Sequence, residues 1–218
     1  MLIQCLGHSK LLLTLQSGYR IVTDPFDAST GYPVGDTEAD AVLVSHHHSD
    51  HDAVDTVRGY TVVIDSEGVH TLNPQIRVRS LACFHDDQKG ALRGNNLIHC
   101  IEAEGMSVVH LGDLGHMPDN ALAERIGHPD VLMIPVGGYY TIDAKTAMDL
   151  CDMLCPKVIL PMHYRTAFNS EWPIAEKDEF AMLCEKKFGS QPEELDLLRV
   201  TADDLSCQPH AAFLRAQV

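Results

Sequence analysis

The strongest constraint on this chain is the segment LVSHHHSDHDAV at residues 43–54, where four histidines and two aspartates follow an apolar run. Imidazoles crowded onto one turn repel each other when protonated, and buried polar side chains need partners. The run that leads into the cluster, ADAVLVS, is too short for a helix and is typical of a buried strand. The histidines therefore lie at the carboxyl end of a strand, and something must neutralise them.

Three further apolar runs end on residues of the same kind. IRVRSLACF ends directly before His85, MSVVHLG before Asp113, and KVILPM before His163. A hairpin is also predicted near the start, because KLLLTLQ and YRIVTD flank Ser17-Gly18. Strand ends thus repeatedly present side chains that are able to bind a metal ion.

The spacing within the histidine cluster suits two metal ions. In an extended segment the side chains of His46 and His48 point the same way, whereas the turn that follows swings Asp50 and His51 toward a second position. Alternation points His47 away from its neighbours, toward packing or solvent. Five imidazoles and two carboxylates suffice to bind a pair of divalent cations, and the set is His46, His48, Asp50, His51, His85, Asp113 and His163.

Strand and helix patterns are mixed along the whole chain, without a linker. The predicted helices lie at 119–126, 144–154 and 176–189, with short ones at 53–57 and 67–72. The other predicted strands lie at 61–65, 95–103, 131–137 and, at a sheet edge, 195–200. Beyond Leu205 no pattern is evident. This mixture predicts a layered α/β sandwich formed by a single domain over residues 1–218.

Composition narrows the range of functions. A net charge of −15 repels a phosphate backbone, which argues against nucleic acid as a partner. No apolar run approaches the roughly 20 residues that span a bilayer, and the start lacks the basic segment of a signal peptide. We therefore expect no membrane association and a cytoplasmic location. Seven cysteines without a CxxC pair indicate reduced thiols, and Cys151 and Cys155 are interpreted as core packing rather than as metal ligands.

SHHHSDH resembles the HxHxDH signature of the metallo-β-lactamase superfamily, whose fold is a four-layer αββα sandwich. The resemblance covers nearly the whole chain, because Asp24 in VTDPF, His85 in CFHDD, Asp113 in HLGDLGH and His163 in LPMHY follow in the family's order. GHSKLLLTL, PVGGYYTIDA and PMHYRT are similar to the compact branch that includes the ascorbate-6-phosphate lactonase and many uncharacterised metal-dependent hydrolases.

The resemblance implies a role for each member of the set. His46, His48 and His85 would hold a first metal ion, Asp50, His51 and His163 a second, and Asp113 would bridge the two. A hydroxide would be shared between the metal ions. Asp24 would orient a ligand histidine through its other ring nitrogen. The true β-lactamases use a cysteine as ligand to the second metal, and its absence here argues against a β-lactam substrate.

Two divalent cations a few ångströms apart lower the pKa of a shared water toward about 7. They also polarise the carbonyl or phosphoryl oxygen at the scissile bond. The predicted reaction is hydrolysis of an ester, lactone or phosphodiester bond in a small, anionic metabolite by a metal-bound hydroxide. Asp50 or Asp113 would take the proton from the attacking water. Zinc is the expected metal, while manganese and iron also suit imidazole and carboxylate ligands.

Several residues are candidates for contacts with the substrate. Tyr139, Tyr140, His110 and His116 could serve the leaving group or an oxyanion; alternatively, the tyrosines form a pocket wall and the histidines belong to the core. Arg165 could anchor an anionic group, as could Lys89, Arg93 or Lys145, with a surface ion pair as the alternative for each. His8 lies either near the floor of the active site or in the core against the first hairpin.

Two other classes of function stay open. The same ligand set binds iron in redox members of the superfamily, such as oxygen reductases and persulfide dioxygenases, although this chain lacks an attached electron-transfer domain. A binding protein that has lost the chemistry would be expected to lose ligands first, and all seven are present. The sequence leaves the oligomeric state open, and related compact enzymes do assemble into homo-oligomers.

Overall fold

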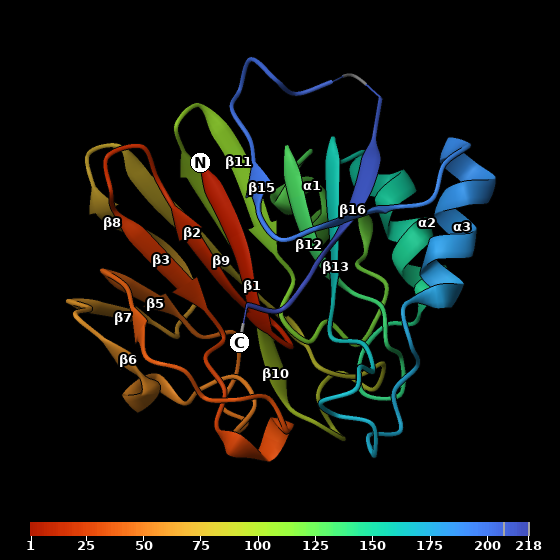
Figure 1. Cartoon of the computed structure of the whole chain (residues 1–218), viewed down its shortest axis with the longest axis horizontal. Helices are drawn as coiled ribbons and strands as arrows, with labels where there is room; N and C mark the ends of the chain where they lie inside the picture. Colours follow the sequence, from red (N-terminus) through yellow and green to blue (C-terminus); the bar gives the residue numbers. More distant parts are fainter. Residues whose placement is uncertain (207, 218) are drawn as a thin grey trace.

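The computed structural model describes residues 1–206 and 208–217, which form two β-sheets packed face to face (Figure 1). The first sheet has the order β15 (Leu198–Arg199), β1 (Leu2–Gly7), β2 (Lys10–Thr14), β3 (Arg20–Thr23), β5 (Ala41–Leu43), β7 (Val62–Ile64). The second has the order β14 (Glu193–Leu195), β16 (His210–Leu214), β13 (Val158–Met162), β12 (Val131–Pro135), β11 (Met106–His110), β10 (Asn95–Ala103), β9 (Ile76–Phe84), β8 (Gly68–Asn73).

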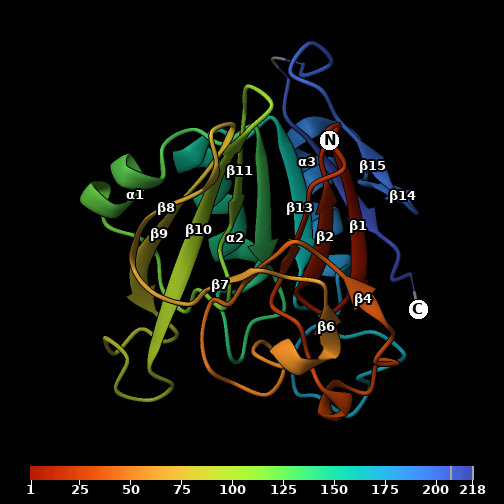
Figure 2. The same ribbon diagram turned by 90° about the vertical axis from the view of Figure 1, so that its left-hand side faces the viewer.

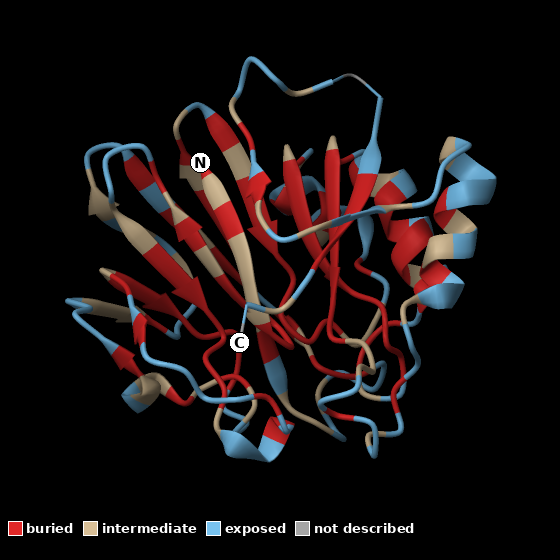
Figure 3. Cartoon of the chain, viewed as in Figure 1, coloured by how far each residue is buried: buried red, intermediate tan, exposed pale blue. Residues whose placement is uncertain are grey.

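The main hydrophobic core lies between the sheets, where Leu13 and Leu43 of the first sheet belong to the same cluster as Val78 and Leu160 of the second. A second core joins the outer face of the eight-stranded sheet to α1 (Asn120–Ile126), α2 (Ala144–Leu154) and α3 (Asp178–Phe188). Because β12 and β13 are covered on both faces, all of their residues are buried, which explains their continuous apolar runs. Figure 3 shows the buried strands and the exposed outer side of α3.

The α/β sandwich expected from the resemblance is confirmed, and the three longer helices lie where the sequence predicts them. Aspartates cap two of them: Asp119 accepts from the Leu122 N–H of α1, and Asp143 from the Thr146 N–H of α2. The outer layer on the six-stranded sheet consists of short pieces: the small sheet of β4 (Thr37–Glu38) and β6 (Val57–Arg58) and the 3₁₀ turns η1 (Ala28–Thr30) and η2 (Val54–Thr56). Figure 2 shows these short pieces below the sheets.

Two predictions at the sheet edges are wrong. The helix expected at 67–72 is strand β8, which pairs antiparallel with the long strand β9 and so satisfies an edge that would otherwise lack partners. The single edge strand expected at 195–200 is two strands in different sheets, because the chain leaves β14 after Leu195 and joins β1 at Leu198. Strands β1 and β16 were not predicted.

Two further expectations from composition concern membrane segments and cysteines. Within residues 1–206 and 208–217, no helix combines the length and the apolar character that a membrane crossing requires. The six described cysteines are free thiols, and Cys207 lies outside the described residues. Cys151 of α2 is buried in the second core, as expected. The core-packing interpretation is wrong for Cys155, which ends that helix in a left-handed conformation and is exposed.

Strand direction explains why the polar strand ends meet. β11, β12 and β13 are parallel, β9 runs in the same direction across the antiparallel β10, and β3, β5 and β7 are parallel in the other sheet. The carboxyl ends of these strands therefore lie at one end of the sandwich. After β16 the chain returns to the first sheet, where the Gln217 N–H donates to the Cys5 carbonyl.

Candidate metal centre

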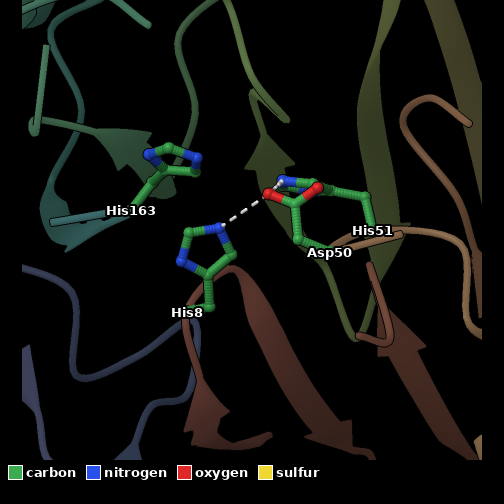
Figure 4. Close-up of side chains that lie close together, drawn as sticks. All are labelled: His8, Asp50, His51 and His163. Atoms are coloured by element: carbon green, nitrogen blue, oxygen red, sulfur yellow. Dashed lines mark ion pairs between the residues drawn. The ribbon is translucent and has the colours of Figure 1, made fainter. Parts of the chain in front are cut away.

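All seven predicted ligands come together at this end of the sandwich. The structure arranges them in three overlapping groups, and within each group the ligating atoms lie within 4.8 Å of one another. The groups are His46, His48 and His85; His46, His51 and Asp113; and His8, Asp50, His51 and His163. Figure 4 shows the last group, in which His8, from the turn after β1, faces Asp50 and His163.

Asp113 lies at the centre of the cluster. One of its oxygens is 3.3 Å from His85 Nε2 and 3.1 Å from His163 Nε2. Its other oxygen is 3.3 Å from His51 Nε2 and has no hydrogen-bond partner. Asp113 therefore contacts His85 of the predicted first set of ligands and His51 and His163 of the predicted second set.

The backbone around Asp113 is built for close approach. Gly112 has φ of +55°, and a Cβ atom there would lie 2.3 Å from Asn96 Oδ1 and 2.5 Å from Ser45 Cβ. Asn96 also accepts the backbone N–H of Asp113, at 2.9 Å. The Gly-Asp pair at the end of this run therefore fixes the carboxylate against β5 and β10.

Asp24, expected to orient one unspecified ligand histidine, contacts His51 directly and His46 through Ser45. Its Oδ2 accepts from His51 Nδ1 at 2.8 Å and from the Ser45 hydroxyl at 2.7 Å. The Ser45 oxygen in turn lies 2.9 Å from His46 Nδ1. When Nδ1 of each ring carries the proton, Nε2 keeps its lone pair and points into the cluster, which is the tautomer that a metal ligand needs. Ser45 was not singled out from the sequence.

Electrostatics in the cluster favour a cation. Desolvation lowers the pKa of His46 to about 3, helped by its proximity to His51, so that its ring is neutral at pH 7. Burial opposes charge on His51 as well, but Asp113, Asp50 and Asp24 together raise its pKa well above the ordinary value. The carboxylates thus draw a proton onto His51, and a metal ion at this place would replace that proton.

His8 is the residue whose place the sequence left most open. It is 4% exposed, its Nε2 lies 3.3 Å from Asp50 Oδ2, and its ring centroid is 4.2 Å from that of His163. His8 and His163 both have left-handed backbones, with φ of +51° and +53°, a strained conformation that is concentrated at functional sites. Of the two places that the sequence left open for His8, the structure shows the one beside the predicted ligands. Its position at the end of a strand could not help to decide, because β1 is not predicted from the sequence.

A cavity of about 460 Å³ opens onto the cluster, within the range of small-molecule sites. The wall beyond the metal-binding side chains contains Tyr140, Trp172 and Arg93, and Trp172 is the only tryptophan in the chain. Tyr139 is not among the lining residues; it is 65% exposed and stacks edge-on against Tyr140. Trp172 is a lining residue that is not predicted from the sequence.

The remaining candidates lie apart from the cavity. His110 is in the core, where its Nε2–H donates to the Ser9 carbonyl at 3.0 Å and its Nδ1 lies 3.9 Å from Asp24 Oδ2. His116 packs on Phe84 and accepts its backbone N–H. Arg165 pairs with Glu176 at 3.1 Å and lines a neighbouring cavity rather than that of the cluster. Lys89 and Lys145 are exposed, as is His47, which contacts Asp52 at 3.3 Å.

The donor set fits divalent metal ions. Imidazole nitrogens and carboxylate oxygens are ligands of zinc, manganese and iron, and several are buried without a hydrogen-bond partner: His46 Nε2, His51 Nε2, His163 Nε2 and Asp113 Oδ1. Buried polar atoms of this kind are costly unless something pairs with them. Bound cations would pair with these four atoms.

Two packed mixed sheets with a histidine and aspartate cluster at their common end define the class, and the chain belongs to the metallo-β-lactamase superfamily. A beta-lactamase superfamily domain model matches residues 2–163. A crystal structure from Thermotoga maritima, of a protein assigned to the Zn-dependent hydrolases of this superfamily, matches with 34% identity and a TM-score of 0.79 over 98% of both chains.

Within the superfamily, the chain is a member of the UPF0173 metal-dependent hydrolases. It is 31% identical to the Methanoregula boonei member over 74% of this chain and 81% of that one. It is 28% identical to the Pelotomaculum thermopropionicum member over 88% of this chain and 98% of that one. The protein is therefore a metal-dependent hydrolase. The closer resemblance to the ascorbate-6-phosphate lactonase stays a prediction.

Proposed function

We propose that this hydrolase uses two divalent metal ions, zinc foremost, to cleave an ester, lactone or phosphodiester bond of a small, anionic metabolite. The observation that carries the proposal is the position of Asp113, whose two oxygens lie within 3.3 Å of imidazoles from both sides of the cluster. His46, His48 and His85 would hold one ion, and Asp50, His51 and His163 the other. When bound, the ions would lower the pKa of a bound water and polarise the carbonyl or phosphoryl oxygen at the scissile bond.

The protein's own residues then have distinct tasks. Asp50 is half-buried and faces the cavity, so that its carboxylate can accept the proton of the attacking water, with Asp113 as the alternative acceptor. His8, in contact with Asp50, holds that carboxylate in place and can pass the proton onward. Asp24 keeps His51 in one orientation. Tyr140 and Trp172 exclude water from the side of the cavity where the substrate body lies.

Several statements about the setting of the reaction remain predictions from the sequence. We predict that the substrate is a small molecule, that neither nucleic acid nor a membrane is a partner, and that the protein is cytoplasmic. A homo-oligomer is possible. The high negative charge supports the exclusion of nucleic acid.

The test is metal content, measured by mass spectrometry on protein purified without chelators or a histidine tag. We expect about two metal ions per wild-type chain, and a loss of at least one of them in His48→Ala. His47→Ala is the matched control, since His47 is exposed next to His48 but points to Asp52; it should keep the metal content and keep activity within about twofold.

Hydrolysis of a lactone, an aryl ester and an aryl phosphodiester by the metal-loaded protein would then identify the bond. Unchanged metal content in His48→Ala would contradict the assignment. Iron with a visible absorption band and no hydrolysis would instead favour the redox function.

A further inference from the structure

The segment from Asp86 to Gly94 forms a fixed loop beside the metal-binding cluster. The Asp86 carboxylate accepts four backbone N–H groups at 2.7–2.9 Å, those of Gln88, Gly90, Leu92 and Arg93. The loop closes on the strand that carries His85, because the His85 N–H donates to the Gly94 carbonyl. The backbone of residue 93 is therefore held in place independently of its side chain.

The Arg93 side chain turns into the cavity of the cluster. It lines that cavity together with His48, His85 and Asp113, and its guanidinium carbon lies 5.4 Å from the centroid of the Tyr140 ring. In the part of the chain that the structure describes, no carboxylate pairs with this guanidinium. By contrast, Arg125 and Arg165 each form an ion pair with a glutamate. A half-buried arginine that contacts an aromatic ring and lacks an acidic partner retains its hydrogen-bonding capacity for a ligand.

The charges of the cavity support the same interpretation. Among its described lining residues, Arg93 alone is a lysine or arginine. Asp50 and Asp113 face the metal-binding groups and are neutralised there when cations are bound. Glu171, the other acidic lining residue, is exposed, so that water and salt screen its charge. An anion in the cavity therefore meets one fixed cation away from the metal ions.

We propose that Arg93 is an anion-binding subsite, which binds a carboxylate or phosphate group of the substrate at a distance from the scissile bond. This inference rests on the proposed hydrolase and names its substrate class: molecules with a hydrolysable bond at one end and an anionic group at the other. Tyr140 and Trp172 contact the body between them. The planar guanidinium suits bidentate binding of either anion, and the aromatic contact holds it ready.

The test uses the single tryptophan as a reporter. Trp172 lines the cavity, so its fluorescence, with calorimetry as a second readout, follows binding to the metal-loaded protein. The probes are butyrate, with one anionic group, and glutarate and 4-phosphonobutyrate, with two. We expect Arg93→Gln to weaken binding of both two-anion probes by about tenfold or more, and butyrate by less than about twofold. Arg93→Lys should retain part of the affinity.

Lys89→Gln is the matched control, because it removes the same charge from an exposed position in the same loop, and it should leave all three affinities unchanged. The probe that binds wild type more tightly tells whether the subsite prefers a carboxylate or a phosphoryl group. Wild-type protein that binds neither glutarate nor 4-phosphonobutyrate better than butyrate overturns the proposal, as does a preference for the two-anion probes that survives in Arg93→Gln. An equal loss for all three probes would assign Arg93 a structural role. Failure to hydrolyse the lactone, the aryl ester and the aryl phosphodiester would contradict the proposed function. The ratio of probe affinities would still test the role of Arg93.

Discussion

Asp86 and Asp113 follow strands on either side of β10, both are at most 2% exposed, and yet their surroundings are opposite. Asp86 accepts four backbone N–H groups. Asp113 faces three histidine rings, and one of its oxygens has no hydrogen-bond partner. The first carboxylate is satisfied by the protein itself, whereas the second needs a bound cation. Burial alone therefore does not distinguish a loop-forming aspartate from a metal ligand; the identity of the donors does.

The largest expected difference is in metal binding when each of the two aspartates is replaced by alanine. Asp113→Ala removes the carboxylate that contacts His51, His85 and His163, and we expect it to lower metal affinity and hydrolysis by at least about 100-fold. Metal analysis and steady-state kinetics measure the effect. Asp86→Ala is the comparison variant and should still bind metal; equal metal loss in both variants would remove the distinction drawn here.

The second expected effect tests whether hydrogen bonds behind the cluster matter. Asp24→Ala removes the acceptor of His51 Nδ1 and of the Ser45 hydroxyl, which in turn contacts His46 Nδ1. The imidazoles of His51 and His46 therefore lose their fixed orientation. We expect metal affinity to fall by about 10- to 100-fold, measured by competition with a chromogenic chelator. Asp24→Asn keeps an acceptor oxygen and should lose less. Full affinity in Asp24→Ala would show that the ligands are held without it.

The smallest expected effect concerns the contribution of the Asp86 carboxylate to the stability of the fold. Burial opposes ionisation of this carboxyl, but the N–H groups of Arg93, Gln88, Gly90 and Leu92 lower its pKa to about 2. A lowered pKa in the folded state stabilises the protein above the ordinary pKa of an aspartate, and this contribution is lost as the pH falls toward 2.

Asp86→Asn should therefore lower the unfolding temperature by a few degrees near pH 7, measured with metal bound, and the difference from wild type should shrink below about pH 4. A difference that grows on acidification would contradict this account of the loop.

The cluster was predictable because its residues follow recognisable apolar runs. His46, Asp113 and His163 each stand where a strand must end, and parallel strands bring such ends together. His8 obeys the same rule, but the alternation in LIQCLG is too weak to mark β1 as a strand. Local pattern thus identified ligands only where it also identified their strands.

Whether Arg165 or Arg93 lines the cavity of the cluster depends on tertiary structure, which local sequence does not reveal. Arg165 follows His163 closely in sequence, which favoured it as the anion anchor. However, the left-handed backbone at His163 redirects the chain, and Arg165 instead binds the Ala175 carbonyl through its N–H and Glu176 through its side chain. Arg93 reaches the cavity from the loop whose backbone N–H groups the Asp86 carboxylate accepts. Similarly, β8 forms because the long β9 requires an edge partner, a cause that lies outside residues 67–72.

The position of β16 between β13 and β14 has a consequence for synthesis on the ribosome. β13 leads into His163, and its parallel neighbour on one side is β16, which is translated well after it. Until residues 210–214 emerge, the nascent chain carries a strand of five apolar residues with an unpaired edge, which invites association with other chains. The topology therefore delays completion of the eight-stranded sheet until β16 has been synthesised.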